Sequence, residues 1–437
     1  MNTQNKEKKL IFIEMNELNY EFVRDYLKKI DLPSLKKIVG TNTINTTSEN
    51  EYRNLEPWIQ WTSVHTGKKA NEHGIFRLGD IINSDHKQIF EIVEDRGFSV
   101  GCVSPMNTAN RLSSKSTFIP DPWTQTNSDD SWWSQNLSSM INQSVNDNSS
   151  GKLSLKSIII LLLAFIRFVR PKKYLRTILL ALTSLGKPWR KALFFDRLLH
   201  EINLHLIKSK KFDFNTVFFN SMAHIQHHYI FNSNAYKGNL KNPYWYIKDN
   251  FDPFFEGLIE FDDIFYDYVN IEKYEFLIAT GLTQNNYDKL DFYWRIKNHD
   301  QFIKYFGIKY KQVIPRMTRD FLVEFNSETE KKDAILILSN IKEKETDRKI
   351  FEHIDERPNS IFVTLTYSCD LKNKYIYYKD RKMLAEEATV FVAIKNGEHC
   401  GDGFLSYSSG IKHILPKDTS HVSEIFNTLN NFFESRR

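Results

Sequence analysis

The sequence has few cysteines, and this scarcity narrows the classes of protein it can encode. Only three occur in 437 residues, Cys102, Cys369 and Cys400, and they lie far apart along the chain. At least one must be unpaired, so we expect no disulfide framework and a reducing compartment. The polar first residues, MNTQNKEKKL, lack the apolar stretch of a secretory signal peptide. We therefore expect a cytoplasmic protein, with peripheral attachment to the inner face of the membrane as an additional option.

A strong excess of charge of one sign is also missing. Lys and Arg number 59 against 54 Asp and Glu, which gives a formal net charge of +5 at pH 7. This charge is mild for the length and argues against general nucleic-acid binding. We expect no nucleic-acid partner.

Several motifs that carry a known chemical mechanism do not occur. The sequence has no Walker A loop, no dinucleotide-binding glycine fingerprint, no Cys-x-x-Cys pair and no Gly-x-Ser-x-Gly. Metal-assisted chemistry is then the best-supported class of activity.

What the chain does contain is a series of short apolar runs of strand length. They are 10–13 (LIFI), 98–103 (FSVGCV), 215–219 (NTVFF), 274–279 (YEFLIA), 334–338 (AILIL), 361–365 (IFVTL) and 389–394 (TVFVAI). Segments with helical spacing flank several of them, and a final amphipathic helix is expected over 422–434. Continuous apolar strands that alternate with helices predict an α/β fold with a mostly parallel sheet covered on both faces. In such folds the chemistry lies at the carboxyl ends of the strands.

Residues 152–210 differ from the rest because they are both apolar and basic. The run IIILLLAFI is too short to span a bilayer, which needs about 20 residues, and the only acids of the segment are Asp196 and Glu201. One interpretation is a helical insertion whose apolar face packs on the domain while its basic residues face solvent. The other is an interfacial segment that contacts an anionic membrane or a lipid-linked substrate. The predicted domains are an α/β core of 8–126 and 212–437, and a loop plus helical insertion of 127–211.

Two acidic residues are candidates for a site. Glu14 follows the first predicted strand, where a carboxylate can bind a metal ion or cap the next helix. Glu56 precedes Pro57, which suits the first position of a helix, and Gly67 suits its end. Glu56 can cap this helix, or it can act beside an anion or a metal-bound water held at the helix N-terminus.

Histidines follow two of the other predicted strands. His224, His227 and His228 fall within five residues of NSMAHIQHH. Neutral imidazoles spaced three or four apart on a helix suit zinc, although one or two of them can equally serve packing. His399 lies in the glycine-rich turn GEHCGDG, where a plain turn is the alternative.

In this order the candidate segments resemble the alkaline phosphatase superfamily, specifically its type I phosphodiesterase/nucleotide pyrophosphatase-like branch. In that family the first strand ends in an acidic metal ligand, as LIFIEMNE does at Glu14. The stretch PWIQWTSVHTGKKANEHGIF is similar to the family's Thr-Trp-Pro-x-Trp-Thr-Ser-x-x-Thr-Gly corner and the His-Gly-Ile-Phe that follows it. VGCVSPMN and FIPDPW look like the next strand and its loop. The segments at 224–228 and 398–404 look like the family's Asp-x-x-x-His segment and its late metal-binding His turn.

The chain departs from the family pattern at the catalytic positions. Pro57 stands where the family has its nucleophilic Thr. ATGL, 279–282, stands where an Asp-His pair is expected, and the Asp of Asp-x-x-x-His falls on Ala223 or Asn220. The resemblance therefore implies at most one metal ion instead of an intact two-zinc site.

We predict one divalent metal ion as cofactor, with zinc as the first choice and manganese or magnesium as alternatives. The predicted residues are the metal ligands Glu14, His224, His227 and His399, the catalytic base Glu56, and the substrate-binding residues Asn16, Asn220 and Thr280.

The predicted function is a metal-dependent hydrolase or transferase acting on a phosphoester or phosphodiester. The basic, apolar insertion suggests a lipid-linked or surface-glycan substrate and contact with a membrane surface through 152–210. The alternative is a catalytically degenerate protein of the same fold that binds a phosphorylated or glycan ligand as a partner of biosynthetic enzymes. A third interpretation is a membrane-surface scaffold built around 152–210.

Overall fold

The structure is a computed structural model that describes residues 8–40, 42–146, 154–316 and 319–436. The chain divides into two compact units, a large one of Met1–Asn286 with Gly397–Arg437 and a small one of Tyr287–Asn396. The domain division expected from the sequence did not separate residues 287–396 from the core. Strands β7 (Thr283–Ile296) and β15 (Thr389–Cys400), which pair with each other, carry the chain out of the large unit and back.

The described residues of the large unit build a sheet of eight strands in the order β17-β2-β16-β6-β1-β5-β3-β4. β1 pairs in parallel with β5 and β6, and β3 pairs in parallel with β5 and β4. β16 is antiparallel to both β2 and β6. The sheet is thus mostly parallel, as predicted. Its strands are β1 (Lys9–Met15), β2 (Thr43–Thr47), β3 (Val100–Val103), β4 (Thr117–Ile119), β5 (Phe214–Phe219), β6 (Tyr274–Ala279), β16 (Asp402–Tyr407) and β17 (Ser420–His421).

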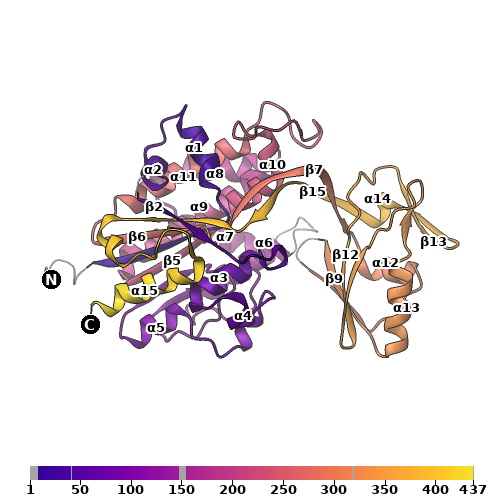
Figure 1. The fold of residues 1–437 in the computed structure, drawn as a ribbon, viewed down its shortest axis with the longest axis horizontal. Helices are drawn as coiled ribbons and strands as arrows, with labels where there is room; N and C mark the ends of the chain where they lie inside the picture. The colour runs from indigo at the N-terminus through magenta and orange to yellow at the C-terminus, as the bar shows by residue number, and fades with distance from the viewer. Residues whose placement is uncertain (1–7, 41, 147–153, 317–318, 437) are drawn as a thin grey trace. The chain divides into compact units, whose positions relative to one another are not determined.

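Helices cover both faces of this sheet, with α3, α5 and α15 on one face and α9, α10 and α11 on the other (Figure 1). The predicted fold class, a mostly parallel sheet flanked by helices, is confirmed. The helices are α1 (Tyr20–Leu27), α2 (Pro33–Ile38), α3 (Pro57–Thr66), α4 (Ala70–His73), α5 (Ile89–Asp95), α6 (Trp132–Asn146), α7 (Leu155–Phe168), α8 (Tyr174–Thr183), α9 (Trp189–Lys210), α10 (Ser221–Tyr229), α11 (Pro253–Val269) and α15 (Ile425–Glu434).

Helix α3 begins and ends where the sequence predicts. Pro57 takes the first helical position after Glu56, and Gly67 caps the end at φ +71° in the left-handed region. A side chain at Gly67 would place its Cβ 2.8 Å from the ring of Phe426, so only glycine fits here. Trp61 and Val64 pack α3 into the core beneath β1. The end of α3 that carries Glu56 is therefore held firmly against the sheet.

The small unit has its own apolar core around Phe321, Phe351 and Leu365. It holds the sheets β11-β12-β9-β8 and β10-β13-β14. Its elements are β8 (Gln312–Pro315), β9 (Asp320–Glu324), β10 (Lys342–Glu343), β11 (His353–Arg357), β12 (Ser360–Thr364), β13 (Tyr375–Tyr378), β14 (Arg381–Leu384), α12 (His299–Tyr305), α13 (Glu328–Leu338) and α14 (Ala385–Ala388).

One predicted strand is wrong. Residues 334–338 form the last turns of α13, which Ser327 caps by accepting a hydrogen bond from the backbone of Glu330. Only one side of the run, with Ala334 and Leu338, is fully buried against the core. A five-residue apolar run fits a strand or one helix face equally well, and here the cap and the preceding polar turns favour the helix.

Helices α7 and α8 agree only in part with the first interpretation of the segment 152–210. Ile160, Ala164 and Phe168 of α7 are buried, as that interpretation expects. Arg170 and Lys173, between the two helices, instead form ion pairs with acids of the large unit. Leu162 and Leu182 are 58% and 64% exposed, so many of the aliphatic residues face outward. No helix among the described residues has both the length and the apolar character needed to cross a bilayer.

Candidate metal centre

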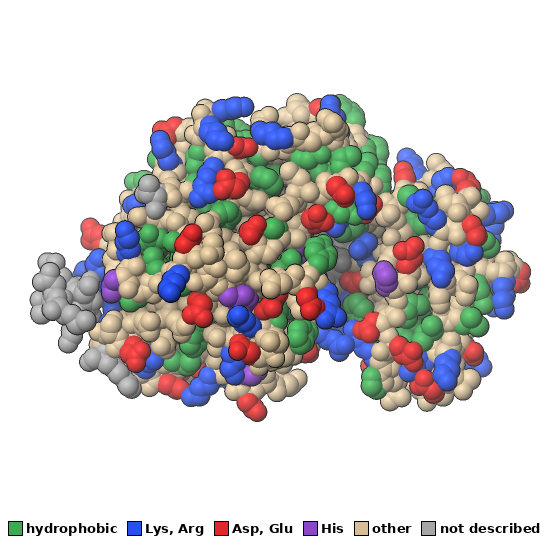
Figure 2. All heavy atoms as spheres, in the orientation of Figure 1, with side chains coloured by type: hydrophobic (Ala, Val, Ile, Leu, Met, Phe, Trp, Pro, Cys, Tyr) green, Lys and Arg blue, Asp and Glu red, His purple; other side chains and the backbone are tan. Residues whose placement is uncertain are grey.

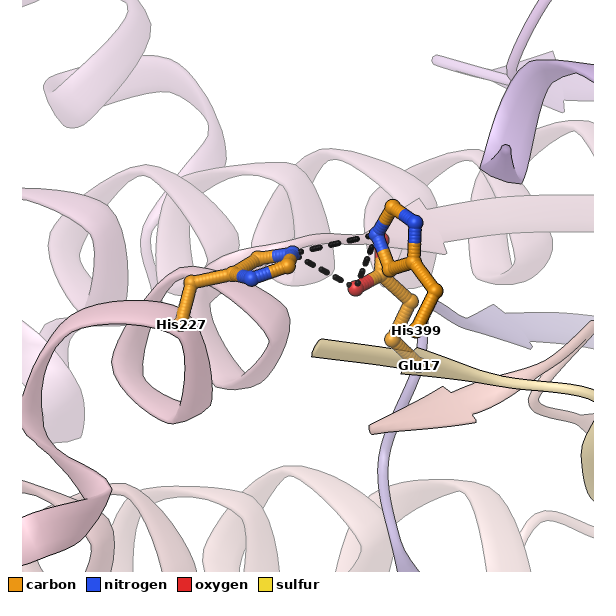
Figure 3. Close-up of side chains that lie close together, drawn as sticks. All are labelled: Glu17, His227 and His399. Atoms are coloured by element: carbon orange, nitrogen blue, oxygen red, sulfur yellow. Dashed lines mark hydrogen bonds and ion pairs between the residues drawn. The ribbon is translucent and has the colours of Figure 1, made fainter. Parts of the chain in front are cut away.

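Three side chains from distant parts of the sequence meet in the large unit at the carboxyl edge of the sheet (Figure 3). His227 Nε2 lies 2.9 Å from Glu17 Oε2, and His399 Nε2 lies 3.3 Å from the same oxygen. The two Nε2 atoms are 3.2 Å apart. Glu17, His227 and His399 are the one group of potential metal ligands found among the described residues, and they are called the Glu17 cluster below.

Glu17 reaches the cluster because the chain turns sharply after β1. Its φ is +58°, in the left-handed region that non-glycine residues seldom adopt. Its N–H donates to Thr280 O at 3.0 Å, and its carbonyl accepts from Gln226 Nε2 at 2.8 Å. Backbone strain of this kind persists where the surroundings enforce it and is concentrated at functional sites.

The Glu17 carboxylate is fixed by amide side chains. Asn16 Nδ2 donates to Glu17 Oε1 at 2.8 Å, and Gln284 Nε2 donates to Oε2. Asn16 is itself held by Trp61 Nε1 and by Asn220 Oδ1, each at 2.8 Å. Burial raises the pKa of Glu17, but the imidazoles of His399 and His227 outweigh this and hold that pKa well below its usual range. The group is therefore an anion ready to bind a cation.

The far nitrogens of both imidazoles face acceptors. His227 Nδ1 donates to Gly397 O at 3.4 Å. His399 Nδ1 lies 3.7 Å from Glu56 Oε2, within ion-pair distance. Acceptors at Nδ1 favour the tautomer whose proton is on Nδ1, which leaves each Nε2 with a free lone pair. Two such lone pairs and a carboxylate oxygen then face one another.

This arrangement fits a divalent cation. Zinc bonds to imidazole nitrogen and carboxylate oxygen are about 2.0–2.2 Å long, so tetrahedral ligands lie about 3.3–3.5 Å apart. The three separations in the Glu17 cluster, 2.9, 3.2 and 3.3 Å, are close to that spacing. Two His and one carboxylate is also a ligand set that leaves a fourth position for water or substrate.

Glu14 lies outside the cluster, although the sequence suggested it as a ligand. β1 continues through Glu14 and Met15 because β5 pairs with both. The buried Glu14 carboxylate accepts from Thr216 Oγ1 at 2.8 Å and lies 3.3 Å from His65 Nε2. Glu17 is the acid beyond the strand end. The sequence EMNE, 14–17, contains both acids. Because β1 extends two residues beyond the predicted strand, Glu14 lies within it and Glu17 is the acid that follows it.

The other predicted residues fall around the cluster in different ways. The ring of His224 packs edge-to-face against that of His228, with the centroids 4.8 Å apart, and is outside the cluster. Burial lowers the pKa of His224 to about 4, and the charges of His227 and Lys191 act in the same direction. Thr280 is fully buried, and its hydroxyl accepts from the backbone of Phe404.

Hydroxyl groups on α3 are engaged in the helix and its packing. Thr62 Oγ1 donates to Trp58 O at 2.8 Å. Ser63 Oγ lies 3.1 Å from His73 Nε2, while His73 Nδ1 accepts from the backbone of Ile75. With Nδ1 as acceptor, the proton of His73 is on Nε2, so this imidazole donates to Ser63 and does not serve as its base. Ser63 is therefore poorly placed to act as a nucleophile.

Comparisons of sequence find no similar family or protein: no protein-family model matches the chain, and no curated protein matches it.

Solved structures similar to the chain include a hydrolase, a pyrophosphatase/phosphodiesterase and a phosphatase. Phosphonoacetate hydrolase from Sinorhizobium meliloti 1021 has 9% identity and a TM-score of 0.41, over 98% of this chain and 96% of that chain. Murine ectonucleotide pyrophosphatase/phosphodiesterase 5 has 10% identity and a TM-score of 0.44, over 98% and 95%. Alkaline phosphatase from the Antarctic bacterium TAB5 has 10% identity and a TM-score of 0.41, over 99% of each chain.

Proposed function

We propose that the chain is a metal-dependent hydrolase or transferase that acts on a phosphoester or phosphodiester. The observation that carries the proposal is the Glu17 cluster, in which one carboxylate oxygen and two imidazole nitrogens face one another within 3.3 Å. With the proton of each imidazole on Nδ1, two lone pairs and a carboxylate oxygen face one another, and a cation between them would be held by all three. Two nitrogen donors favour zinc over magnesium, and manganese is the second choice.

The metal would be held by Glu17, His227 and His399, with Asn16 and Gln284 fixing the carboxylate. When bound, such an ion polarises a phosphoryl oxygen and lowers the pKa of a coordinated water. The N-terminus of α3 approaches the cluster through Glu56, and the helix dipole there favours an anionic group. These features together support a phosphorylated substrate.

Glu56 is the proposed general base. Its side chain is 36% exposed and makes no cap bond to α3, so it is accessible to a water molecule at the cluster. It would accept the proton as the water oxygen bonds to phosphorus and the bond to the leaving oxygen breaks. The compartment proposed from the cysteine content is the cytoplasm, and a lipid-linked or surface-glycan phosphoester is the proposed substrate.

A second candidate function is ligand binding without turnover. It is favoured by Pro57, which has no nucleophilic side chain, and by the engaged hydroxyls of Thr62 and Ser63. Such a protein would bind a phosphorylated or glycan ligand as a partner of biosynthetic enzymes.

Metal content and turnover test the proposal together. We expect the purified chain to bind about one zinc ion, measured by elemental analysis after dialysis, and to hydrolyse bis-p-nitrophenyl phosphate. His227→Ala and His399→Ala should lose the metal. His224→Ala is the matched control, since it removes an imidazole of the same helix that lies outside the cluster, and it should keep the metal.

The outcomes separate the two candidates. Equal metal content in wild type, His227→Ala and His399→Ala would overturn the metal centre. Metal bound at the cluster together with no turnover of mono- or diesters would favour the ligand-binding function.

A further inference from the structure

Helices α7 and α8 expose an unusual number of large aliphatic side chains. Each of eleven such residues is between 42% and 94% exposed, and together they are called the aliphatic face: Leu155, Ile158, Ile159, Leu162, Leu163, Ile166, Leu175, Ile178, Leu179, Leu182 and Leu185. Elsewhere in the described residues only Ile259, Leu336, Val390 and Val392 are comparable. Both helices pack on α9, and the rings of Phe165 on α7 and Tyr174 on α8 lie 4.8 Å apart, so the two sets of exposed residues belong to neighbouring helices. Exposed apolar residues gathered in this way mark an interaction site.

The outward side of α7 is apolar where a surface helix is usually polar. Its buried stripe is Ser157, Ile160, Ala164 and Phe168, which pack on the large unit. The opposite side should then carry charged or polar residues. It carries Leu and Ile instead, and the same holds for α8, whose one fully buried residue is Thr177.

The aliphatic face is held outward by ion pairs on the opposite side. Arg170 pairs with Glu201 of α9 and Asp267 of α11. Lys173 and Arg176 pair with Asp263 and Glu260 of α11. These basic side chains are only 17–35% exposed. The packing of α7 and α8 on the large unit therefore orients the aliphatic residues toward the outside.

The charged residues near the aliphatic face indicate which kind of partner it binds. Between residues 154 and 195 the sequence contains no Asp or Glu, and the acids that follow, Asp196 and Glu201, are buried. The exposed charges beside the aliphatic face are the basic Lys156, Arg167 and Lys172. Over much of the face visible in Figure 2, by contrast, acids and bases are interspersed. The exposed charges of this segment are thus all positive, and aliphatic residues combined with positive charge match a hydrocarbon layer beneath anionic headgroups.

A protein partner fits this face less well. Protein interfaces are anchored by Trp, Tyr and Arg, whereas Leu is under-represented among their hot spots. The aliphatic face consists of Leu and Ile only. A crossing of the bilayer is also excluded for α7, because its 14 residues span about 21 Å against the ~30 Å of a hydrocarbon core.

We propose that the aliphatic face docks the chain on the surface of a lipid bilayer that contains anionic lipids, with α7 and α8 lying in the plane of the headgroups. The inference does not depend on the metal centre. The aliphatic face and the metal centre are nevertheless connected through α9, on which α8 packs. Helix α9 begins at Trp189, and the ring of Trp189 lies 5.4 Å from that of Tyr229. Tyr229 ends α10, the helix that carries His227.

Co-sedimentation of the full chain with vesicles tests the proposal. We expect binding to phosphatidylcholine vesicles that contain phosphatidylglycerol, and weaker binding to phosphatidylcholine alone or in high salt. Leu162→Gln combined with Leu182→Gln should weaken binding about tenfold or more, because two exposed aliphatic side chains leave the contact. Leu336→Gln is the matched control, since Leu336 is 59% exposed on a helix of the small unit, and it should bind as wild type does.

Further measurements distinguish membrane docking from misfolding of the variants and from self-association of the chain. Both variants should keep the wild-type circular dichroism spectrum and the hydrolysis of a soluble diester. No binding by wild type, or equal binding by wild type and the double variant, would overturn membrane docking. A wild-type dimer that the double variant converts to a monomer, without vesicle binding, would assign the face to a second copy of the chain.

Discussion

At the scale of single residues, the position of one carboxylate decides which chemistry the sheet edge can support. Glu17 is held in a left-handed conformation by Thr280 and Gln226, and its side chain is turned toward His227 and His399. Asn16, Asn220 and Thr280, which the sequence predicts to bind substrate, make hydrogen bonds around this turn. We infer that these residues hold the ligand geometry, and that Glu56 is the group left to act on substrate or water.

Replacement of Glu56 tests this assignment. We expect Glu56→Gln to lower kcat for diester hydrolysis by about 10²–10⁴-fold, because an amide does not accept the proton of the attacking water. The metal content should stay near the wild-type value, since Glu56 is not one of the three ligands and the amide oxygen of Gln can still accept from His399 Nδ1. Steady-state kinetics and elemental analysis on the same preparation measure both quantities.

Ser63→Ala is the comparison for Glu56→Gln. The Ser63 hydroxyl is buried against His73, so its loss should leave kcat within about twofold while removing one internal hydrogen bond of about 1 kcal/mol. A loss of turnover in Ser63→Ala as large as in Glu56→Gln would mean that Ser63 is the nucleophile and that the assignment is wrong.

At the scale of elements, the sequence predicts those whose signal is local. Pro57 and Gly67 define α3 because each residue restricts the backbone at its own position. The choice between Glu14 and Glu17 depends on where β5 stops pairing with β1, which is a long-range property. The run 334–338 fits a buried strand and one face of a helix equally well, and only its packing against the core of the small unit selects the helix.

The segment between α7 and α8 shows the same limit. Its basic residues were expected in solvent, but the acids that pair with them, such as Asp263 and Asp267, lie about 90 residues away on α11. Residue type alone predicts that a basic side chain is exposed only when no acid from a distant part of the sequence pairs with it in the folded chain. The orientation of α7 and α8 is therefore a property of the folded chain.

The ion pairs at Arg170 should stabilise the chain in a pH-dependent way. Burial raises the pKa of Asp267, but the hydrogen bonds from His200 and Arg170 and the charges of both groups outweigh this effect. The pKa of Asp267 therefore lies well below its usual value. A depressed carboxyl pKa adds stability above the unfolded value, about 3.9, and that stability is lost as the pH falls through the folded value. Arg170→Met should cost about 3–5 kcal/mol at pH 7, because Glu201 is fully buried and loses its partner.

Urea unfolding at pH 7 and near pH 3 measures this effect. The difference between wild type and Arg170→Met should shrink at the lower pH, where protonation removes part of the charge that Arg170 compensates. Lys172→Met is the control, because Lys172 is an exposed neighbour in the same turn, and it should change stability by less than about 0.5 kcal/mol. A difference that is equal at both pH values would contradict the electrostatic origin.

At the scale of the whole molecule, two separate apolar cores stabilise the two units. The large unit packs around residues such as Phe214 and Trp61, and the small unit around Phe321 and Phe351. The Glu17 cluster and the aliphatic face both belong to the large unit. The small unit interrupts the chain between Asn286 and Gly397, so it is inserted just before the end of β15, which carries His399.

Because each unit has its own apolar core, we expect the large and the small unit to unfold separately. Phe321→Ala should create a cavity that costs about 3–5 kcal/mol in the small unit alone. Because stability is then lost in one cooperative unit, amide hydrogen exchange should accelerate over α12, β9 and β12 while α3 and α10 stay protected. Phe214→Ala is the matched variant in the other core and should reverse the pattern. Equal acceleration in both units by either variant would show a single cooperative core, and the metal centre would then depend on the packing of the small unit as well.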